Sequence, residues 1–165
     1  MTTCSNATKY DTVIFHKNCL DGLASAWVYR HYNKSKKVNY IPEVPSSTSI
    51  PPNTYGKKIL ILDVSYQLET LHQLANDANC LLLIDHHISN QKSQDSLPYT
   101  RFNLNNSACV ATWHYFFPNK KIPLFLKLIE ANDLGQFHNK DAMCFNSYLL
   151  YLFPKVSFKY NALAL

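Results

Sequence analysis

The sequence predicts an α/β fold with a parallel sheet, and three observations support that prediction. Short apolar runs alternate with longer amphipathic segments along most of the chain. One run, residues 80–84, is continuously apolar, which is typical of a strand buried on both faces inside a parallel sheet. The chain has 165 residues, of which 47% are hydrophobic, so it can bury the core of a single domain.

The first half of the chain predicts strands and helices in alternation. A turn at Asp21-Gly22 separates the first strand from the first helix. A proline-rich and serine-rich stretch in the middle predicts a surface loop. In order, the predicted elements are a strand at 12–15, a helix at 23–32, a strand at 38–42, a loop at 43–57, a strand at 58–62 and a helix at 68–78.

The second half continues the alternation and then becomes harder to assign. The predicted elements are a strand at 80–84, a polar loop at 89–99 and helices at 109–117 and 124–131. We divide the chain into a polar N-terminal segment at 1–10, one domain at 11–140, and a C-terminal segment at 141–165 that packs on the domain or on a partner. The apolar, aromatic stretch 145–165 has no assigned secondary structure, and a homodimer through this region is expected to be feasible.

The charge of the chain favours anionic partners. The formal net charge is +5 and the pI is about 8.9. The lysines form short groups without a long basic stripe, which argues against binding of extended duplexes. The charge alone leaves nucleotides, nucleic acid and a membrane surface open as partners; together with the motifs described below, it leads us to expect a small nucleotide or a short single-stranded oligonucleotide.

The five cysteines are widely spaced and contain no CxxC pair. Cys80 and Cys109 lie in apolar runs, which predicts buried thiols. An odd, scattered set predicts a reducing compartment. The N-terminal segment lacks an apolar signal core and no stretch reaches membrane-spanning length, so we expect a cytoplasmic protein that does not enter a membrane.

Polar side chains end three of the predicted strands. His16 follows the first strand, with Asp21 close behind it; Asp63 ends the third; and the triplet Asp85-His86-His87 ends the fourth. Because the carboxyl ends of parallel strands form the ligand crevice, we expect these side chains to converge. Asp133, at the end of a predicted helix, is a fourth candidate.

Such a cluster of acids and imidazoles predicts a metal centre. Carboxylates placed together repel one another unless a cation compensates them. A mixed imidazole and carboxylate set fits a transition metal such as manganese, with magnesium, zinc, iron or cobalt left open. Two ions about 3.5–4 Å apart that share a carboxylate would activate a bridging water for phosphoester hydrolysis.

Each residue also has a structural interpretation. Asp63 and Asp133 are also suited to capping a helix or a turn, and Ser107, ahead of a predicted helix, is expected to be an N-cap. His16 alone is typical of a hydrogen-bonded surface histidine. The acidic and imidazole triplet after a wholly apolar strand is harder to explain in this way. Aromatic side chains on the predicted helices are expected to lie in the core or an interface, with base stacking as the alternative: Trp27, Trp113, Tyr115, Phe116 and Phe117.

These segments resemble the motifs of the DHH phosphoesterase family, which is named for the triplet at 85–87. The first motif resembles residues 15–22 (FHKNCLDG), the second Leu62-Asp63, and the fourth Asp133 in an Asn-Asp-Leu context. The family includes RecJ-type exonucleases, oligoribonucleases, cyclic-dinucleotide phosphodiesterases and manganese pyrophosphatases. The resemblance implies a Rossmann-like, mostly parallel five-stranded sheet with helices on both faces.

The resemblance also implies a pair of manganese ions. One would be held by His16, Asp21 and Asp63, and the other by Asp63, His86 and Asp133, with Asp63 as the bridge. This arrangement implies a metal-dependent phosphoesterase that cleaves phosphodiester or phosphomonoester bonds in short oligonucleotides or small nucleotides.

The remaining triplet residues would be catalytic, with His87 facing the substrate phosphate and Asp85 orienting the neighbouring imidazoles. Two departures from the family pattern favour an alternative. The first motif has one acid instead of two, with Cys19 or Leu23 in the other place, and the glycine-rich substrate-binding domain that family members carry is expected to be missing. The alternative is a weak or inactive relative that binds nucleotide or metal in a regulatory role, and a third interpretation makes the strand-end residues simple helix caps.

Overall fold

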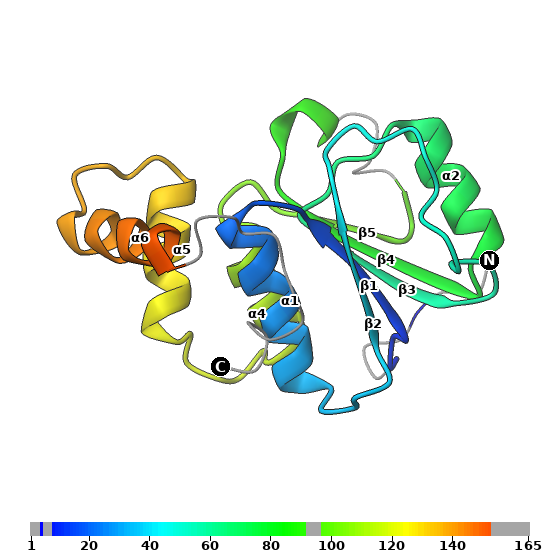
Figure 1. Cartoon of the computed structure of the whole chain (residues 1–165), viewed down its shortest axis with the longest axis horizontal. Coiled ribbons are helices and arrows are strands. Elements are labelled where there is room, and N and C mark those ends of the chain that lie inside the picture. Colours follow the sequence, from blue (N-terminus) through cyan, green and yellow to red (C-terminus); the bar gives the residue numbers. More distant parts are fainter. Residues whose placement is uncertain (1–3, 5–7, 92–96, 153–165) are drawn as a thin grey trace.

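Five parallel strands form the sheet at the centre of the structure (Figure 1). The computed structural model describes residues 4, 8–91 and 97–152. Every neighbouring pair of strands runs parallel, in the order β2-β1-β3-β4-β5. The predicted α/β class is therefore confirmed, and the fold is Rossmann-like. The strands are β1 (Thr12–His16), β2 (Asn39–Glu43), β3 (Lys58–Leu62), β4 (Cys80–Asp85) and β5 (Thr100–Phe102).

The strand order reverses at β1. The chain passes from β1 to β2 on one side and then to β3 on the other, so the crossover connections diverge between β1 and β3. In sheets of this topology, ligands bind in the crevice outside the carboxyl ends of the strands at this switch point. The register pairs Phe15 with Leu62, and so brings the ends of the two strands side by side.

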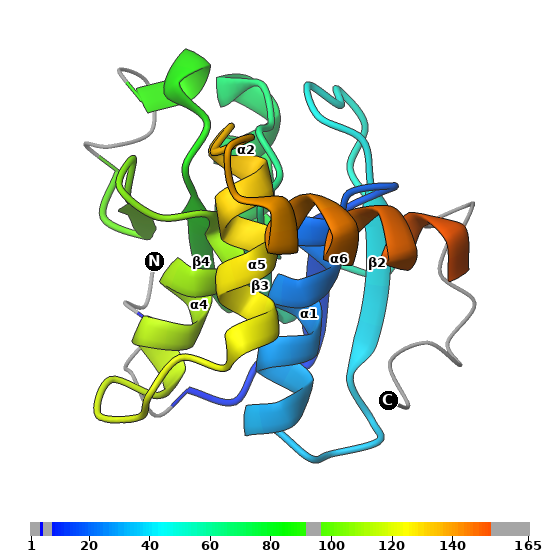
Figure 2. The same ribbon diagram turned by 90° about the vertical axis from the view of Figure 1, so that its left-hand side faces the viewer.

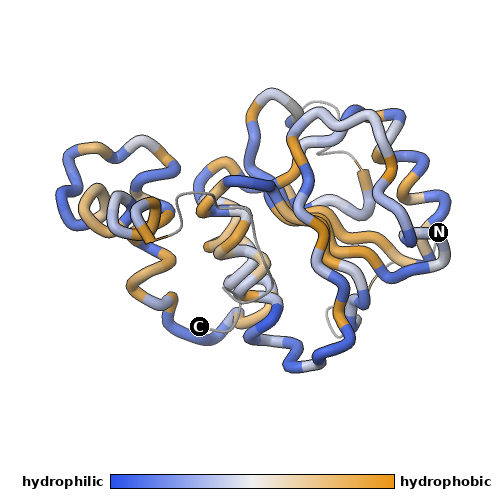
Figure 3. Tube along the Cα trace, viewed as in Figure 1, coloured by the Kyte–Doolittle hydropathy of each residue, from blue (hydrophilic) through white to orange (hydrophobic). Residues whose placement is uncertain are grey.

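Helices cover both faces of the sheet, as predicted (Figure 1). One face packs against α1 (Leu20–Tyr32) and α4 (Ala108–Phe116), and the other against α2 (Leu68–Asp77). Alternate residues of each strand point to opposite faces, and each face buries its own apolar cluster. The strands are the most continuously hydrophobic part of the trace in Figure 3.

Two further helices form a layer outside α1 and α4. The helix α5 (Leu124–Asp133) packs against both, and α6 (Lys140–Leu152) lies across α5 (Figure 2). Buried Asn146 of α6 donates from Nδ2 to the backbone oxygen of Leu128 at 3.0 Å, which fixes that contact. The outer surface of α6 exposes apolar side chains: Met143, Tyr148, Leu150, Tyr151 and Leu152.

The helix α6 includes part of the C-terminal segment 141–165, of which the stretch 145–165 had no predicted secondary structure. Residues 141–152 of that segment belong to this helix on the domain, and residues 153–165 lie outside the described chain, as do 1–3 and 5–7 of the N-terminal segment. Dimerisation through the C-terminal region stays a prediction. No helix in the described ranges is long and apolar enough to cross a membrane.

The element boundaries differ slightly from prediction. The strand β2 is shifted by one residue, and α1 begins at Leu20, three residues earlier than expected. The strand β5 was not recognised from the residues because it is only three residues long and follows a polar loop. A short 3-10 helix, Ile88–Asn90, occupies the start of that loop.

The predicted placement of the aromatic residues is confirmed. Trp113 and Phe116 are buried in the core. Trp27, Tyr115 and Phe117 are partly buried and pack against the apolar clusters of the α1 and α4 layer.

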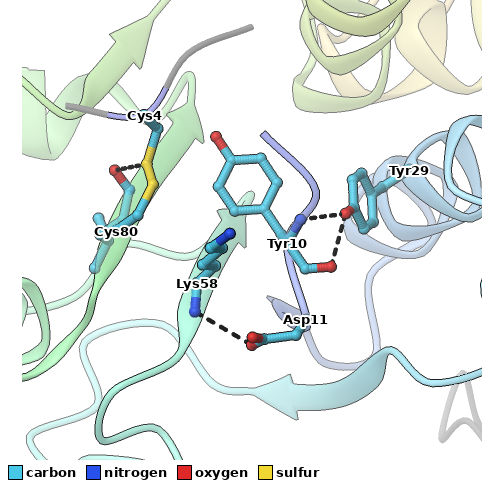
Figure 4. Close-up of a disulfide and its surroundings, with 7 residues drawn as sticks. Cys4, Tyr10, Asp11, Tyr29, Lys58 and Cys80 are labelled. Carbon is cyan, nitrogen blue, oxygen red and sulfur yellow. Dashed lines mark hydrogen bonds between the residues drawn. A yellow bond between two sulfur atoms is a disulfide. The ribbon is translucent and has the colours of Figure 1, made fainter. Parts of the chain in front are cut away.

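One cysteine prediction is wrong. Cys80 is not a free thiol but forms a disulfide with Cys4, which joins the N-terminal segment to the start of β4 (Figure 4). Two of the five cysteines therefore form a disulfide, and the cysteines no longer support a reducing compartment. Cys109 is a free, buried thiol as predicted. Beside the disulfide, the Tyr29 hydroxyl donates to the backbone oxygen of Tyr10 at 2.8 Å and anchors the chain just before β1.

Candidate metal centre

The site begins at the switch point of the sheet. His16 is the last residue of β1, and Asp63 directly follows β3. His16 Nδ1 lies 3.3 Å from Asp63 Oδ2. Asp63 is almost fully buried and has a positive φ of 62°, a backbone conformation that a non-glycine residue adopts at a cost. Strain of this kind is common at functional sites, because the surrounding structure holds the residue there.

Gly22 allows the first turn of α1 to pack against the end of β1. A Cβ atom at this position would lie 2.6 Å from His16 Cβ and 2.7 Å from His16 O. Such distances are well inside van der Waals contact, so only glycine fits. The prediction of a turn at Asp21-Gly22 is wrong, because both residues lie in the first turn of α1, and the close contact of Gly22 with His16 sets the place of that histidine.

The triplet lies at the end of β4, and its acid is wholly buried. Asp85 Oδ1 accepts from His87 Nδ1 at 2.7 Å and from the backbone N–H of His86 at 2.8 Å. The other oxygen accepts from the Ser65 hydroxyl at 3.2 Å. Asp85 thus orients the ring of His87, whereas the ring of His86 is held by other acids.

The ring of His86 sits among three carboxylates. Its Nε2 lies 3.4 Å from Asp63 Oδ1, 3.4 Å from Asp133 Oδ2 and 3.6 Å from Asp21 Oδ2. The three acids come from the residue after β3, from α5 and from α1, so the fold gathers residues that are more than 100 positions apart in sequence. All seven residues singled out from the sequence meet here.

The grouping of the ligand atoms differs from the one that the resemblance implies. Two sets of three ligand atoms lie within 4.8 Å of one another: His16 with Asp63 and His87, and Asp21 with Asp63 and His86. Asp63 belongs to both sets, as expected for a bridging carboxylate. Asp21 joins His86 instead of His16, because its carboxylate turns toward α4, and Asp133 stands next to His86 outside either set.

Asp21 has a structural role that the sequence did not predict. Its two oxygens accept the backbone N–H groups of Ala108 and Cys109, at 2.7 and 2.9 Å, and so cap α4 from the opposite helix. Ser107, the expected N-cap, occupies the N-cap position but makes no capping hydrogen bond with its side chain. A carboxylate 87 residues away in sequence replaces the local cap, so the histidine and aspartate cluster and the start of α4 share a residue.

The charges in the cluster shift one another's pKa values. Burial, reinforced by Asp63 and Asp133, raises the pKa of Asp21 to about 7. Burial also raises the pKa of Asp63, but the imidazoles of His16 and His86 outweigh it and lower the value to about 2. Burial lowers the pKa of His86, yet the surrounding acids raise it to about 9. Without a cation, the cluster therefore holds protons on groups that are ordinarily deprotonated at neutral pH.

These features fit a divalent cation. Asp63 Oδ1 is buried and accepts no hydrogen bond among the described residues, and its contact with His86 Nε2 is an ion pair at 3.4 Å, although a buried carboxylate oxygen normally has a hydrogen-bond partner. A bound cation would satisfy this oxygen and would replace the protons that His86 and Asp21 retain. The mixture of imidazole nitrogen and carboxylate oxygen suits manganese, and also zinc, iron or cobalt.

Cys19 lies beside the cluster but outside both ligand sets. Burial and the charge of Asp63 raise the pKa of its thiol, which keeps it neutral. It therefore does not replace the missing acid of the first motif in the metal-free arrangement. Sequence reasoning assigned no role to Ser65, and its only signal was its position two residues after a strand-end aspartate; Gly22 was named for a turn and not for its contact with His16.

Fold and site together define an α/β protein with a histidine and aspartate cluster at the switch point of its sheet. It is 30% identical to uncharacterized protein R106 of Acanthamoeba polyphaga mimivirus in an alignment of 147 residues that covers 80% of this chain. The chain spans about a third of that relative, 35% of its length. No protein-family model matches the chain.

A solved structure resembles the fold. The crystal structure of an uncharacterized protein from Helicobacter pylori G27 is similar with a TM-score of 0.59 over 78% of this chain and 44% of that chain. The sequence identity is 16%, so this likeness supports the fold alone. The geometry of the site is therefore the feature of the chain that bears on its function.

Proposed function

We propose that this protein is a divalent-metal-dependent phosphoesterase of the DHH type, with manganese as the favoured metal. Its substrates are phosphodiester or phosphomonoester bonds in short oligonucleotides or small nucleotides. The observation that carries the proposal is the buried Asp63 carboxylate, which is shared by two histidine-containing ligand sets and has one oxygen without a hydrogen bond. The net charge of +5 supports an anionic substrate.

The residues of the chain have distinct tasks in this proposal. Asp63 would bridge the metal pair, with His16 on one side, Asp21 and His86 on the other, and Asp133 beside His86. His87, the third member of the first ligand set, is assigned to the substrate because Asp85 engages its Nδ1. Two divalent ions bound there supply water activation and stabilise charge that develops on the phosphate oxygens.

His87 is the residue that faces substrate. Its Nδ1 is engaged by Asp85 and its side chain is 32% exposed, so Nε2 is the nitrogen that can exchange a proton or a hydrogen bond with a phosphoester oxygen. The hydrogen bond from the imidazole to Asp85 raises the pKa of His87, which favours its proton-donating form.

Hydrolysis of a short oligonucleotide with added manganese tests the proposal. Turnover is expected for the native chain and is expected to vanish in Asp63→Asn, which keeps the size of the side chain but removes its charge. Asp141→Asn, an exposed acid in the first turn of α6, is the matched control and should keep its rate. If the protein binds manganese and cleaves no phosphoester, the enzyme proposal is wrong.

A second function has one specific observation in its favour. The first motif lacks one acid, and Cys19 does not take its place in either ligand set. A protein that retains a metal and nucleotide pocket without catalysis would serve as a binding protein. Nucleotide binding by calorimetry without any turnover would favour this function, and multiple turnovers would eliminate it.

A further inference from the structure

A groove between β5 and α4 lies outside the metal cluster. Its volume is about 480 Å³, within the range of about 300–1,000 Å³ typical of small-molecule sites. We call it the β5–α4 groove. Its lining includes Ile84, Arg101, Phe102, Asn103, His114 and Tyr115.

Side chains from α4 and from β5 line the two walls of the groove. The helix contributes Ala111, His114 and Tyr115, which are spaced three and four residues apart and so share one face of α4. On the sheet side, Arg101 is paired in register with Ile84, whose side chain belongs to the cluster under α1 and α4. Neighbouring residues in register point to the same face of a sheet, so Arg101 projects toward α4.

The groove is suited to an anion. Arg101 is exposed and donates one hydrogen bond, from Nη1 to the backbone oxygen of Thr100 at 2.8 Å. Within the described ranges it forms no ion pair, and no acid lines the groove. A guanidinium has five N–H donors in a planar fork that matches a phosphate group, so most of its bonding capacity remains for a ligand.

The groove is also suited to a flat ring. Tyr115 and Phe102 are half-buried, and His114 is exposed on the rim. Aromatic side chains next to a cation are the usual combination for binding a nucleobase and its phosphate, because the base stacks while the charge pairs.

Both walls are attached to the metal cluster. The backbone N–H of Asn103 donates to the backbone oxygen of Asp85 at 3.1 Å, directly after β5. The start of α4 is held by the carboxylate of Asp21. A ligand in the groove therefore lies against the same strand and helix that position the acids of the site.

We propose that the β5–α4 groove binds a nucleoside monophosphate unit of the substrate, with its phosphate on Arg101 and its base against Tyr115 and His114. This inference rests on the proposed function in one respect, that the bound nucleotide is part of the substrate. Binding of the nucleotide itself does not require the metal. The same chemistry is offered by a free nucleotide or by one residue of an oligonucleotide, and both serve as probes.

The test is calorimetric titration of the full chain with adenosine monophosphate in the presence of a chelator. Saturable binding is expected, and Arg101→Gln should weaken it ~10- to 100-fold, as for loss of a hydrogen bond to a charged group. The matched control is Arg30→Gln, which removes the other arginine of the chain, on α1, and should leave the affinity unchanged. A second variant, His114→Ala, should weaken binding at least ~5-fold, as for loss of base stacking.

The outcomes separate the two proposals. Absence of saturable nucleotide binding, or equal affinity in Arg101→Gln and the native chain, overturns the proposal that the groove binds a nucleotide, whatever the result of the hydrolysis assay. Equal affinities for adenosine monophosphate and inorganic phosphate overturn the base contact. A dinucleotide that binds more tightly than the monophosphate assigns the groove to one unit of an oligonucleotide, and equal binding assigns it to a free nucleotide. Nucleotide binding without manganese-dependent hydrolysis supports the groove and removes the phosphoesterase.

Discussion

Gly22→Ala is the substitution that most sharply tests how the fold builds the site. The added Cβ would meet three atoms of His16 (N, O and Cβ) at 2.6–2.9 Å, and two of these are backbone atoms that cannot rotate away. To reach 3.4 Å, α1 and the end of β1 must separate by as much as about 0.8 Å. His16 would then move away from Asp63, which it now approaches to 3.3 Å.

Two energetic effects of Gly22→Ala oppose each other, and their magnitudes decide whether the substitution lowers the free energy of unfolding. Overpacking costs about 1–3 kcal/mol, whereas replacing glycine by alanine inside a helix gains about 1 kcal/mol. The expected net loss in the free energy of unfolding is therefore about 0–2 kcal/mol, or a fall in Tm of up to roughly 8 °C for a chain of this size. The variant should also lose part of its stabilisation by manganese, since a tenfold weaker affinity removes about 1.4 kcal/mol of it.

The assay is urea unfolding of each protein with a chelator and with excess manganese. Gly56→Ala is the matched control, because Gly56 has a positive φ of 66° but no atom within 4 Å of the added Cβ. It should lose about 1 kcal/mol from backbone strain and keep its full response to manganese. If Gly22→Ala is as stable as the native chain and responds equally to manganese, the inferred link between α1 and His16 is wrong.

Three further predictions follow from the structure. In the metal-free protein the free energy of unfolding should fall as the pH rises from 6.5 to about 9. The raised pKa of His86 stabilises the folded state fully below pH 6.5, and this stabilisation is lost as the imidazole loses its proton. A flat profile of stability against pH in urea titrations would contradict this. Cys4→Ser should lower stability by roughly 4 kcal/mol, because the disulfide links residues 76 apart, and a native chain that melts at the same temperature with and without reductant would refute it. Ser65→Ala should cost about 1–3 kcal/mol by removing a donor from the buried Asp85, which the same urea titrations measure against Ser89→Ala, an exposed serine.

The architecture was predictable where hydrophobic pattern alone decides structure. The continuous apolar run that became β4 and the alternation of strands with helices were sufficient for the parallel sheet. The convergence of His16, Asp63 and the triplet at 85–87 followed from one rule, that carboxyl ends of parallel strands meet at one edge. These features depend on short-range sequence patterns and can therefore be predicted without a structure.

Other features depend on contacts that no local pattern records. The capping of α4 by Asp21 joins residues 87 apart, and Ser107 was the better local candidate. The division of the ligands into two sets likewise follows from the direction in which Asp21 points. The disulfide of Cys80 could not be predicted, because spacing does not specify which cysteines pair.

The number of manganese ions bound per chain tests the central claim most directly. Equilibrium dialysis followed by elemental analysis is expected to give two ions for the native chain and none at the same free concentration for Asp63→Asn, because both ligand sets contain that carboxylate. Asp141→Asn should still bind two. A native chain that binds no manganese, or an Asp63→Asn variant that binds as much as the native chain, would contradict the account.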